Sequence, residues 1–268
     1  MDLSFLSDGR FFLIAGPCVI EGRDFLMRHA EALKEITASL DIPFIFKSSF
    51  DKGNRTSRES FRGVGLEKGL MILEEVKRAF DVPVLTDVHE SSQTMMVAEV
   101  CDVLQIPAFL ARQTDLLVAA GFTSRYVNIK KPQWAHPADM QHAAAKVRAT
   151  GNKNILLTER GSTYGYGNLV VDFRSLPIMA ETRYPVVMDI THSVQLPGGL
   201  GSSSGGDRRF IPALARAAVA VGVSGIFAEV HEDPSNAKSD AATQWPLSEL
   251  RPLLESLLRI REAVGYGT

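Results

Sequence analysis

Eight short apolar runs, each ending in charged, polar or metal-ligating side chains, constrain the fold of this chain most strongly. The runs are FFLIAGPC, PFIFKSS, PVLTDVH, DVLQIPAF, YVNIKKPQ, NILLTERG, PVVMDITH and GIFAEVH. They are continuous rather than alternating in polarity, which is typical of parallel strands covered on both faces. Helix-like sequence follows each run. A (β/α)8 (TIM) barrel explains the pattern, because its active site lies at the carboxyl ends of the strands.

The segments between the runs predict the remaining elements. Apolar residues at helical spacing predict helices over residues 24–39, 66–80, 137–149, 208–221 and 247–264. Residues 3–15 are predicted to form a β-hairpin with its turn at Asp8-Gly9, which would plug the amino-terminal end of the barrel. Residues 48–64 and 196–207 fit neither class, and loops of this length are usually functional or mobile. We expect residues 1–268 to form one catalytic domain.

The bulk composition excludes several classes of protein. A length of 268 residues suits one barrel of about 250 residues. A net charge of −2 argues against a surface for nucleic acid or anionic membranes. The longest N-terminal apolar run, FFLIAG, is too short for a membrane span and lacks a basic leader. We therefore expect a cytoplasmic protein, with Cys18 and Cys101 as thiols rather than a disulfide.

Cations gather after three of the runs. They are Lys47, Lys52, Arg55 and Arg58 after the second run, Lys130 and Lys131 after the fifth, and Arg160 after the sixth. Arginine binds phosphate or carboxylate through two hydrogen bonds and lysine supplies a point charge, so the set predicts a substrate with several anionic groups. A solvated surface is the alternative for each cation alone. Alternation along a strand turns Lys131 away from Lys130, so we expect its replacement to matter little.

A second set of side chains has the chemistry of a metal site. Cys18, His192, Glu229 and Asp240 follow the first, seventh and eighth runs, which become neighbours when a barrel closes. One thiolate, one imidazole and two carboxylates suit a divalent transition ion such as Fe, Zn, Co or Mn. The alternative for a single buried cysteine is a core residue, which is our interpretation of Cys101. For His89 and His231, ligation and simple hydrogen bonding stay open.

Several long motifs then resemble those of one enzyme family. KSSFDKGNRTS looks like the signature KSSFDKANRSS of the 3-deoxy-D-manno-octulosonate 8-phosphate synthases, and LQIPAFLARQTDLL, TERGSTYGYGNLVVDFRSLPIM and FAEVHEDPSNAKSDAATQWPL resemble further family blocks. The resemblance runs from about residue 12 to 250. It implies condensation of phosphoenolpyruvate with arabinose 5-phosphate for lipopolysaccharide biosynthesis, with release of phosphate, and a homotetramer. Cys18, where metal-independent members carry Asn, implies the metal-dependent class.

The resemblance also implies roles for individual residues. Those expected to act in catalysis are Lys47, Lys52, Asp87, His89, Lys130, His192 and Asp240. Those expected to bind substrate are Ser49, Asn54, Arg55, Thr56, Gln105, Ala108 and Arg160. Lys47, Ser49, Lys52 and Gln105 would hold the phosphoenolpyruvate carboxylate side, whereas Ala108, Lys130 and Arg160 would hold its phosphate. Asn54, Arg55 and Thr56 would receive the phosphate of the sugar, and Asp87 and His89 would lie near the reacting ends.

Three alternative functions remain at this point. The sibling 3-deoxy-D-arabino-heptulosonate 7-phosphate synthases use erythrose 4-phosphate, but they typically carry a KPRT-type motif where this chain has KSSFDKGNRT. A metal-dependent barrel hydrolase or aldolase would leave the separated cations without a use. A non-catalytic sugar-phosphate-binding barrel would need no metal beside two anion sites. The sequence does not choose between a metal that polarises the aldehyde and one that activates water.

Overall fold

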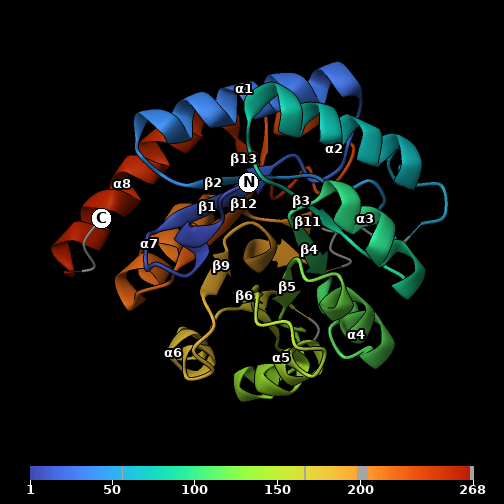
Figure 1. The fold of residues 1–268 in the computed structure, drawn as a ribbon. Coiled ribbons are helices and arrows are strands. Elements are labelled where there is room, and N and C mark those ends of the chain that lie inside the picture. The colour runs from blue at the N-terminus through green and yellow to red at the C-terminus, as the bar shows by residue number, and fades with distance from the viewer. Residues whose placement is uncertain (56, 166, 198–204, 266–268) are drawn as a thin grey trace.

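The computed structural model of the protein describes residues 1–55, 57–165, 167–197 and 205–265, and these form a closed parallel barrel ringed by helices (Figure 1). Within the described residues the barrel strands are β1 Phe12–Gly16, β2 Phe44–Lys47, β3 Val84–Asp87, β4 Val103–Ile106, β5 Tyr126–Lys130, β6 Ile155–Glu159, β9 Val186–Asp189 and β12 Gly225–His231. Neighbouring strands pair in that order, and β1 pairs with β12 to close the ring. The predicted (β/α)8 barrel is confirmed.

Helices cover the outside of the barrel, where their apolar faces pack against the strands. In the described part of the chain they are α1 Arg23–Ser39, α2 Leu66–Phe80, α3 Thr94–Val100, α4 Thr114–Phe122, α5 Met140–Arg148, α6 Ser175–Ala180, α7 Ile211–Val221 and α8 Leu250–Ala263. All five predicted helices are present. Three of them begin with a 3-10 turn, at Pro137–Asp139, Arg208–Phe210 and Leu247–Glu249. No helix among the described residues has both the length and the apolar character needed to cross a membrane.

The amino-terminal segment closes the bottom of the barrel, although not as the predicted hairpin. Residues Ser4–Leu6 form a 3-10 helix, η1, and only the last part of the segment is strand. Phe5 and Leu6 are buried against the inward side chains Phe12, Ile14, Ile45, Leu85, Val103, Leu156, Val187 and Phe227. The local turn exists, because Asp8 accepts a hydrogen bond from the N–H of Arg10 and Gly9 has a φ of 89°. Burial of two apolar side chains under the barrel therefore replaces strand pairing.

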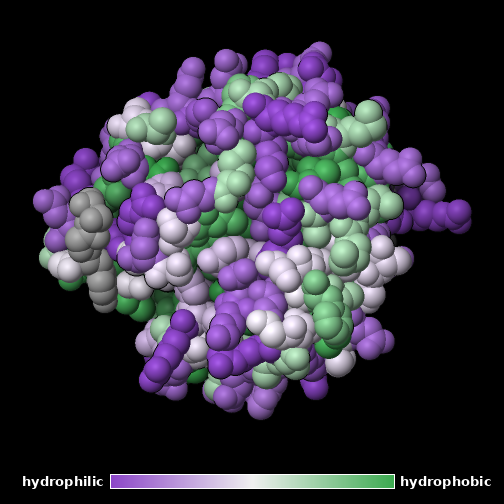
Figure 2. Space-filling view, viewed as in Figure 1, coloured by the Kyte–Doolittle hydropathy of each residue, from purple (hydrophilic) through white to green (hydrophobic). Residues whose placement is uncertain are grey.

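Short elements shape the loops at the opposite end. They are β7 Ser162–Thr163 with β8 Leu169–Val170, β10 Gln195–Leu196 with β11 Gly205–Gly206, and β13 Trp245–Pro246 beside β12. The loop after β2 is held by bridges between Val19 and Ser49 and between Asp51 and Gly63. The surface in Figure 2 is mostly hydrophilic, with scattered apolar groups and no long apolar band on this face.

Candidate active site

A cavity of about 700 Å³ opens where the barrel strands end, and it gathers most of the side chains singled out above. Its lining includes Lys47, Lys52, Asn54, Arg55, Asp87, His89, Gln105, Ala108, Lys130, Arg160, His192, Glu229 and Asp240. Cys18 and Ser49 are fully buried and contact this lining from below. Thr56 lies outside the described residues, and Arg58 is exposed. The sequence therefore predicted most of one site from the ends of separate strands.

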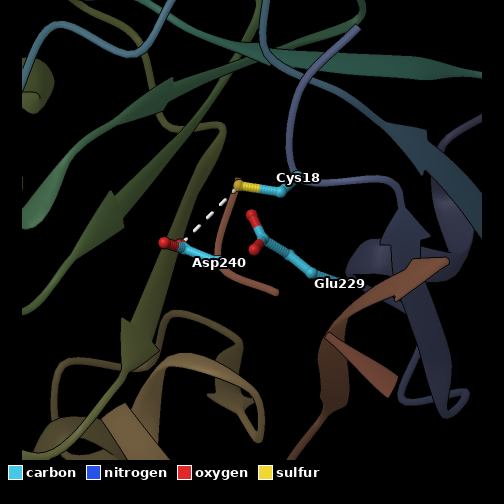
Figure 3. A group of neighbouring side chains, drawn as sticks. All are labelled: Cys18, Glu229 and Asp240. Carbon is cyan, nitrogen blue, oxygen red and sulfur yellow. Dashed lines mark hydrogen bonds between the residues drawn. The ribbon is translucent and has the colours of Figure 1, made fainter. Parts of the chain in front are cut away.

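The predicted metal ligands converge at the seam between β1 and β12. Cys18 follows β1, Glu229 belongs to β12 and Asp240 lies in the loop beyond it; one ligand atom from each falls within 4.8 Å of the others (Figure 3). Cys18 Sγ lies 3.6 Å from Asp240 Oδ2. Glu229 Oε2 is buried and has no hydrogen-bond partner among the described residues. A thiol and two carboxylates that face one point, one of them with an oxygen that has no hydrogen-bond partner, fit a divalent cation.

His192 faces the same place from the end of β9. Its Nε2 lies 3.6 Å from Glu229 Oε1 and 3.7 Å from Asp240 Oδ2. Its Nδ1 lies 2.6 Å from Asp189 Oδ2, so the Asp189 carboxylate orients the ring as such partners do behind metal-bound histidines. Sequence reasoning missed Asp189. An acidic residue that ends the apolar run VVMD was the signal that could have identified it.

The electrostatics of this seam also suit a cation. Burial and the Glu229 carboxylate raise the pKa of Cys18, so the thiol keeps its proton in the apo protein. A coordinated divalent ion would remove that proton outright. Burial alone would raise the pKa of Glu229, but Lys47 and His192 outweigh it and hold this pKa well below its usual value. The site therefore combines the ionised carboxylate of Glu229 with a thiol that a bound cation would ionise.

Two lysines form the next layer of charge. Lys47 Nζ lies 2.7 Å from Glu229 Oε1 and donates to the carbonyl oxygen of Cys18. Lys52 Nζ lies 3.6 Å from Glu229 Oε1 and 4.0 Å from Asp87 Oδ2. Burial lowers the pKa of Lys52, but the surrounding carboxylates, Glu229 and Asp87 among them, more than compensate and raise it. Lys52 therefore stays charged, and the two neighbouring amines can hold a carboxylate.

A chain of buried hydrogen bonds fixes the polar groups on the neighbouring strands. Ser49 Oγ donates to Asp87, and Gln105 Nε2 donates to Asp87 Oδ1 over 2.7 Å. Asn128 donates to Gln105 Oε1, and Thr158 donates to Asn128. Every member is thus satisfied, and the amide of Gln105 has a defined orientation. Asn128 and Thr158 were not anticipated, because their role depends only on cross-strand neighbours.

The side expected to receive a phosphate lies between β5, β6 and β9. Lys130 Nζ bonds to Asp189 and lies 3.5 Å from the centroid of the Phe227 ring. Arg160 Nη2 donates to Gln195 Oε1, whereas its Nη1 is buried without a partner in the part of the chain described. Gln195, which was also not predicted, donates to Asp240 Oδ2 and so links Arg160 to Asp240. A dehydrated guanidinium edge without a partner is a site built for an anion.

The candidate for a second anion site is the loop after β2, which also lines the cavity. Arg55 Nε donates to the carbonyl oxygen of Phe61, which holds the side chain over the mouth. Arg55 Nη1 is 3.9 Å from Asp240 Oδ1, and Nη2 is buried with no partner in residues 1–55, 57–165, 167–197 and 205–265. Asn54 lines the same edge. The two unsatisfied guanidinium edges, on Arg55 and Arg160, therefore come from different walls of one cavity.

The remaining histidines and the second cysteine have different roles. His89 lines the cavity, and burial lowers its pKa, so its ring is neutral near pH 7. His231 accepts a hydrogen bond from the N–H of Asp233, and its Nε2 lies 3.4 Å from Glu21 Oε1. His231 is therefore held by a backbone hydrogen bond through one ring nitrogen, and it is not part of the Cys18, Glu229 and Asp240 group. Cys101 is buried in the apolar core, as predicted.

Comparison with known proteins agrees with this geometry. The profile of the DAHP synthetase I family matches residues 5–264. The chain belongs to this family. It is 58% identical over 266 residues to the 2-dehydro-3-deoxyphosphooctonate aldolase of Cyanothece sp.. This alignment covers 99% of this chain and 97% of that protein. The proteins of the same name from Syntrophobacter fumaroxidans (58% over 260 residues, 96% and 90%) and Magnetococcus marinus (60% over 245 residues, 91% and 85%) are similar along their length.

Proposed function

We propose that this family member condenses phosphoenolpyruvate with arabinose 5-phosphate and water to 3-deoxy-D-manno-octulosonate 8-phosphate, releasing inorganic phosphate. The observation that carries the proposal is the pair of unsatisfied guanidinium edges, Arg160 after β6 and Arg55 on the loop after β2, in one cavity that several lysines also line. Two phosphorylated substrates that react end to end need that layout. Relatives that match most of the chain at 56–60% identity are named 2-dehydro-3-deoxyphosphooctonate aldolase, after this product.

The residues of this chain bring the two substrates together. Lys130 and Arg160 hold the phosphate of phosphoenolpyruvate, and Lys47 and Lys52 hold its carboxylate. Arg55, with Asn54 and Thr56, holds the phosphate of the sugar. C3 of phosphoenolpyruvate then attacks the aldehyde carbon C1 of the open-chain sugar, water adds at C2, and the hemiketal phosphate loses phosphate by C–O cleavage. Fixing both anions converts a bimolecular encounter into an oriented reaction within one cavity.

Protons must be moved at the reacting ends as the new bonds form. Asp87 and His89 line the same cavity. Burial raises the pKa of Asp87, but Lys47 and Lys52 more than offset that and keep the carboxyl ionised. His89 is neutral and can accept a proton from water or a sugar hydroxyl. Ser49 and Gln105 orient the Asp87 carboxylate through two hydrogen bonds, one to each oxygen.

A divalent transition ion belongs to this proposal. Cys18, Glu229 and Asp240 would hold it, with His192 as the fourth ligand, because their donor atoms face one another at the β1–β12 seam. When bound, such an ion polarises a carbonyl oxygen or acidifies a bound water. We also propose, from the family resemblance, a cytoplasmic homotetramer; the two free, buried thiols fit a reducing compartment.

The sibling reaction with erythrose 4-phosphate is the second candidate, because the family as a whole bears the name of that activity. The loop after β2 argues against it, since its KSSFDKGNRT sequence differs from the KPRT type. The test is phosphate release from phosphoenolpyruvate with arabinose 5-phosphate, erythrose 4-phosphate or ribose 5-phosphate as acceptor. We expect arabinose 5-phosphate to give the highest kcat/KM. Phosphate release with erythrose 4-phosphate alone would transfer the chain to the sibling reaction, and binding without release would leave a non-catalytic barrel.

A further inference from the structure

A fully buried ion pair lies directly behind the phosphate-side cations and outside the cavity lining of the described residues. Lys131 follows Lys130 at the end of β5, and Glu159 is the last residue of β6, immediately before Arg160. Lys131 Nζ lies 3.4 Å from Glu159 Oε1, and the two side chains are 0% and 1% exposed. Lys131 therefore points away from the pocket, as predicted. Its burial in an ion pair is a reason to revise the expectation that its replacement matters little.

Glu159 determines the backbone conformation that carries Arg160. Its Oε1 accepts hydrogen bonds from the N–H of Arg160 at 2.9 Å and of Gly161 at 2.7 Å. Gly161 has a φ of 90°, a left-handed conformation that glycine adopts without strain. The carboxylate thus closes a tight turn at the end of β6. The position of the Arg160 side chain depends on that turn.

Lys131 connects this turn to the neighbouring strand. Its Nζ donates to Ser162 Oγ at 3.1 Å and to the carbonyl oxygen of Pro132 at 3.2 Å. Ser162 begins β7, just beyond the Glu159 turn, whereas Pro132 follows the end of β5. One ammonium group therefore joins the segments that follow Lys130 and Arg160. The Lys131–Glu159 pair, which lies outside the cavity, therefore constrains the distance between Lys130 and Arg160.

We propose that the Lys131–Glu159 pair is a positioning device for the phosphate of phosphoenolpyruvate. This inference rests on the proposed function, which assigns that phosphate to Lys130 and Arg160. A buried ion pair adds little net stability compared with apolar residues of the same volume, so stability alone does not explain its presence. The pair instead holds two substrate-binding cations at one spacing without touching the substrate.

The test uses near-isosteric replacements of each partner. Glu159→Gln keeps an oxygen acceptor for the turn but removes the charge, and Lys131→Met removes the ammonium group. We expect each variant to raise KM for phosphoenolpyruvate, and Kd for inorganic phosphate measured by calorimetry, by about ten- to a hundredfold, because small displacements of binding groups cost that much. KM for arabinose 5-phosphate should change by less than about twofold, since Arg55 lies on another wall. The double variant should be no worse than the poorer single variant, because the residues act as one unit.

A partly buried ion pair elsewhere in the barrel provides the control. Lys77 of α2 lies 2.7 Å from Asp102 at the start of β4, with side chains 20% and 4% exposed, and neither lines the cavity as described. Lys77→Met should lower the melting temperature and leave KM for both substrates unchanged. If the Lys131 and Glu159 variants behave like this control, or raise both KM values equally, the positioning role is refuted.

The phosphate measurement separates this inference from the proposed function. If the wild-type enzyme binds inorganic phosphate but does not turn over the two substrates, the proposed function fails while the positioning role remains testable by calorimetry. If Lys131→Met does not fold, Glu159→Gln still decides the question through the same two measurements. Unchanged phosphate affinity in a folded Glu159→Gln variant would overturn the inference.

Discussion

Replacing Arg160 with alanine tests how the cavity divides its two anions. The Arg160 guanidinium is buried, and Nη1 has no partner in the described residues while Nη2 is held by Gln195. Folding has therefore already removed water from the group, and substrate binding adds a charge-assisted hydrogen bond without that cost. Such a bond contributes about 1.5–3 kcal/mol. The loss corresponds to roughly ten- to a hundredfold in the apparent affinity for phosphoenolpyruvate.

The reciprocal variant is Arg55→Ala. Its Nη2 is equally buried and unpaired within the described part of the chain, but it lies on the loop after β2. The same reasoning predicts a loss of similar size for arabinose 5-phosphate and a small effect on phosphoenolpyruvate. Arg10, which pairs with exposed Asp8 on the amino-terminal segment, gives a control variant, Arg10→Ala, that should change neither.

The assay is continuous phosphate release, with each substrate varied at saturating levels of the other. kcat/KM is compared for the wild type and the three variants, because it reports the loss of transition-state stabilisation for the varied substrate. A melting curve for each variant confirms that it is folded. Equal losses for both substrates in both cavity variants would mean one shared anion site, and the two-anion interpretation would then be wrong.

Four further predictions follow from single features of the structure. A strong chelator should abolish activity, and a divalent transition ion, but not Mg²⁺ alone, should restore it, because a thiolate–imidazole site favours softer ions; full activity in a preparation shown by elemental analysis to be metal-free would contradict this. Cys18→Asn should fold but purify with much less metal, and unchanged metal content would remove Cys18 from the ligands. Leu6→Ala should lower the free energy of unfolding by about 2–5 kcal/mol, measured by denaturant titration, with both KM values unchanged; a loss below 1 kcal/mol would mean that the plug is loosely packed. His29 donates from Nδ1 to Phe25, accepts from the N–H of Glu232 and faces His231, and burial lowers its pKa below 6.5. As pH falls through 6.5, the unfolded chain therefore binds more protons than the folded protein, which destabilises the wild type. Between pH 7.5 and 5.5 the melting temperature of His29→Gln should fall less than that of the wild type. Parallel curves of melting temperature against pH for the two proteins would contradict a neutral His29.

The sequence predicted elements whose signal is local and repeated. Continuous apolar runs identified the barrel strands, and helical spacing identified α1 and α2 almost to the residue. The hairpin prediction was wrong although Asp8-Gly9 does form a turn. The side chains before the turn pack under the barrel and do not pair as a strand. A turn motif specifies the local backbone conformation, whereas tertiary packing decides whether the flanking segments pair as strands.

The candidate site divides in the same way. Residues such as Lys47 and Glu229 could be found because they interrupt an apolar run at its carboxyl end. Asp189 and Gln195 have meaning only through their partners: one connects Lys130 to His192, and the other connects Arg160 to Asp240. Spatial adjacency across β5, β6 and β9 creates those links. Single-sequence spacing carries no information about them.

The candidate metal ligands have a consequence for the order of events during synthesis. Cys18 leaves the ribosome early, but Asp240 lies 222 residues further along the chain. The thiol meets its carboxylate partners only when the last strand pairs with the first and the ring closes. A nascent or truncated chain that lacks the loop after β12 therefore has an incomplete set of candidate ligands. We expect metal uptake to follow closure of the barrel.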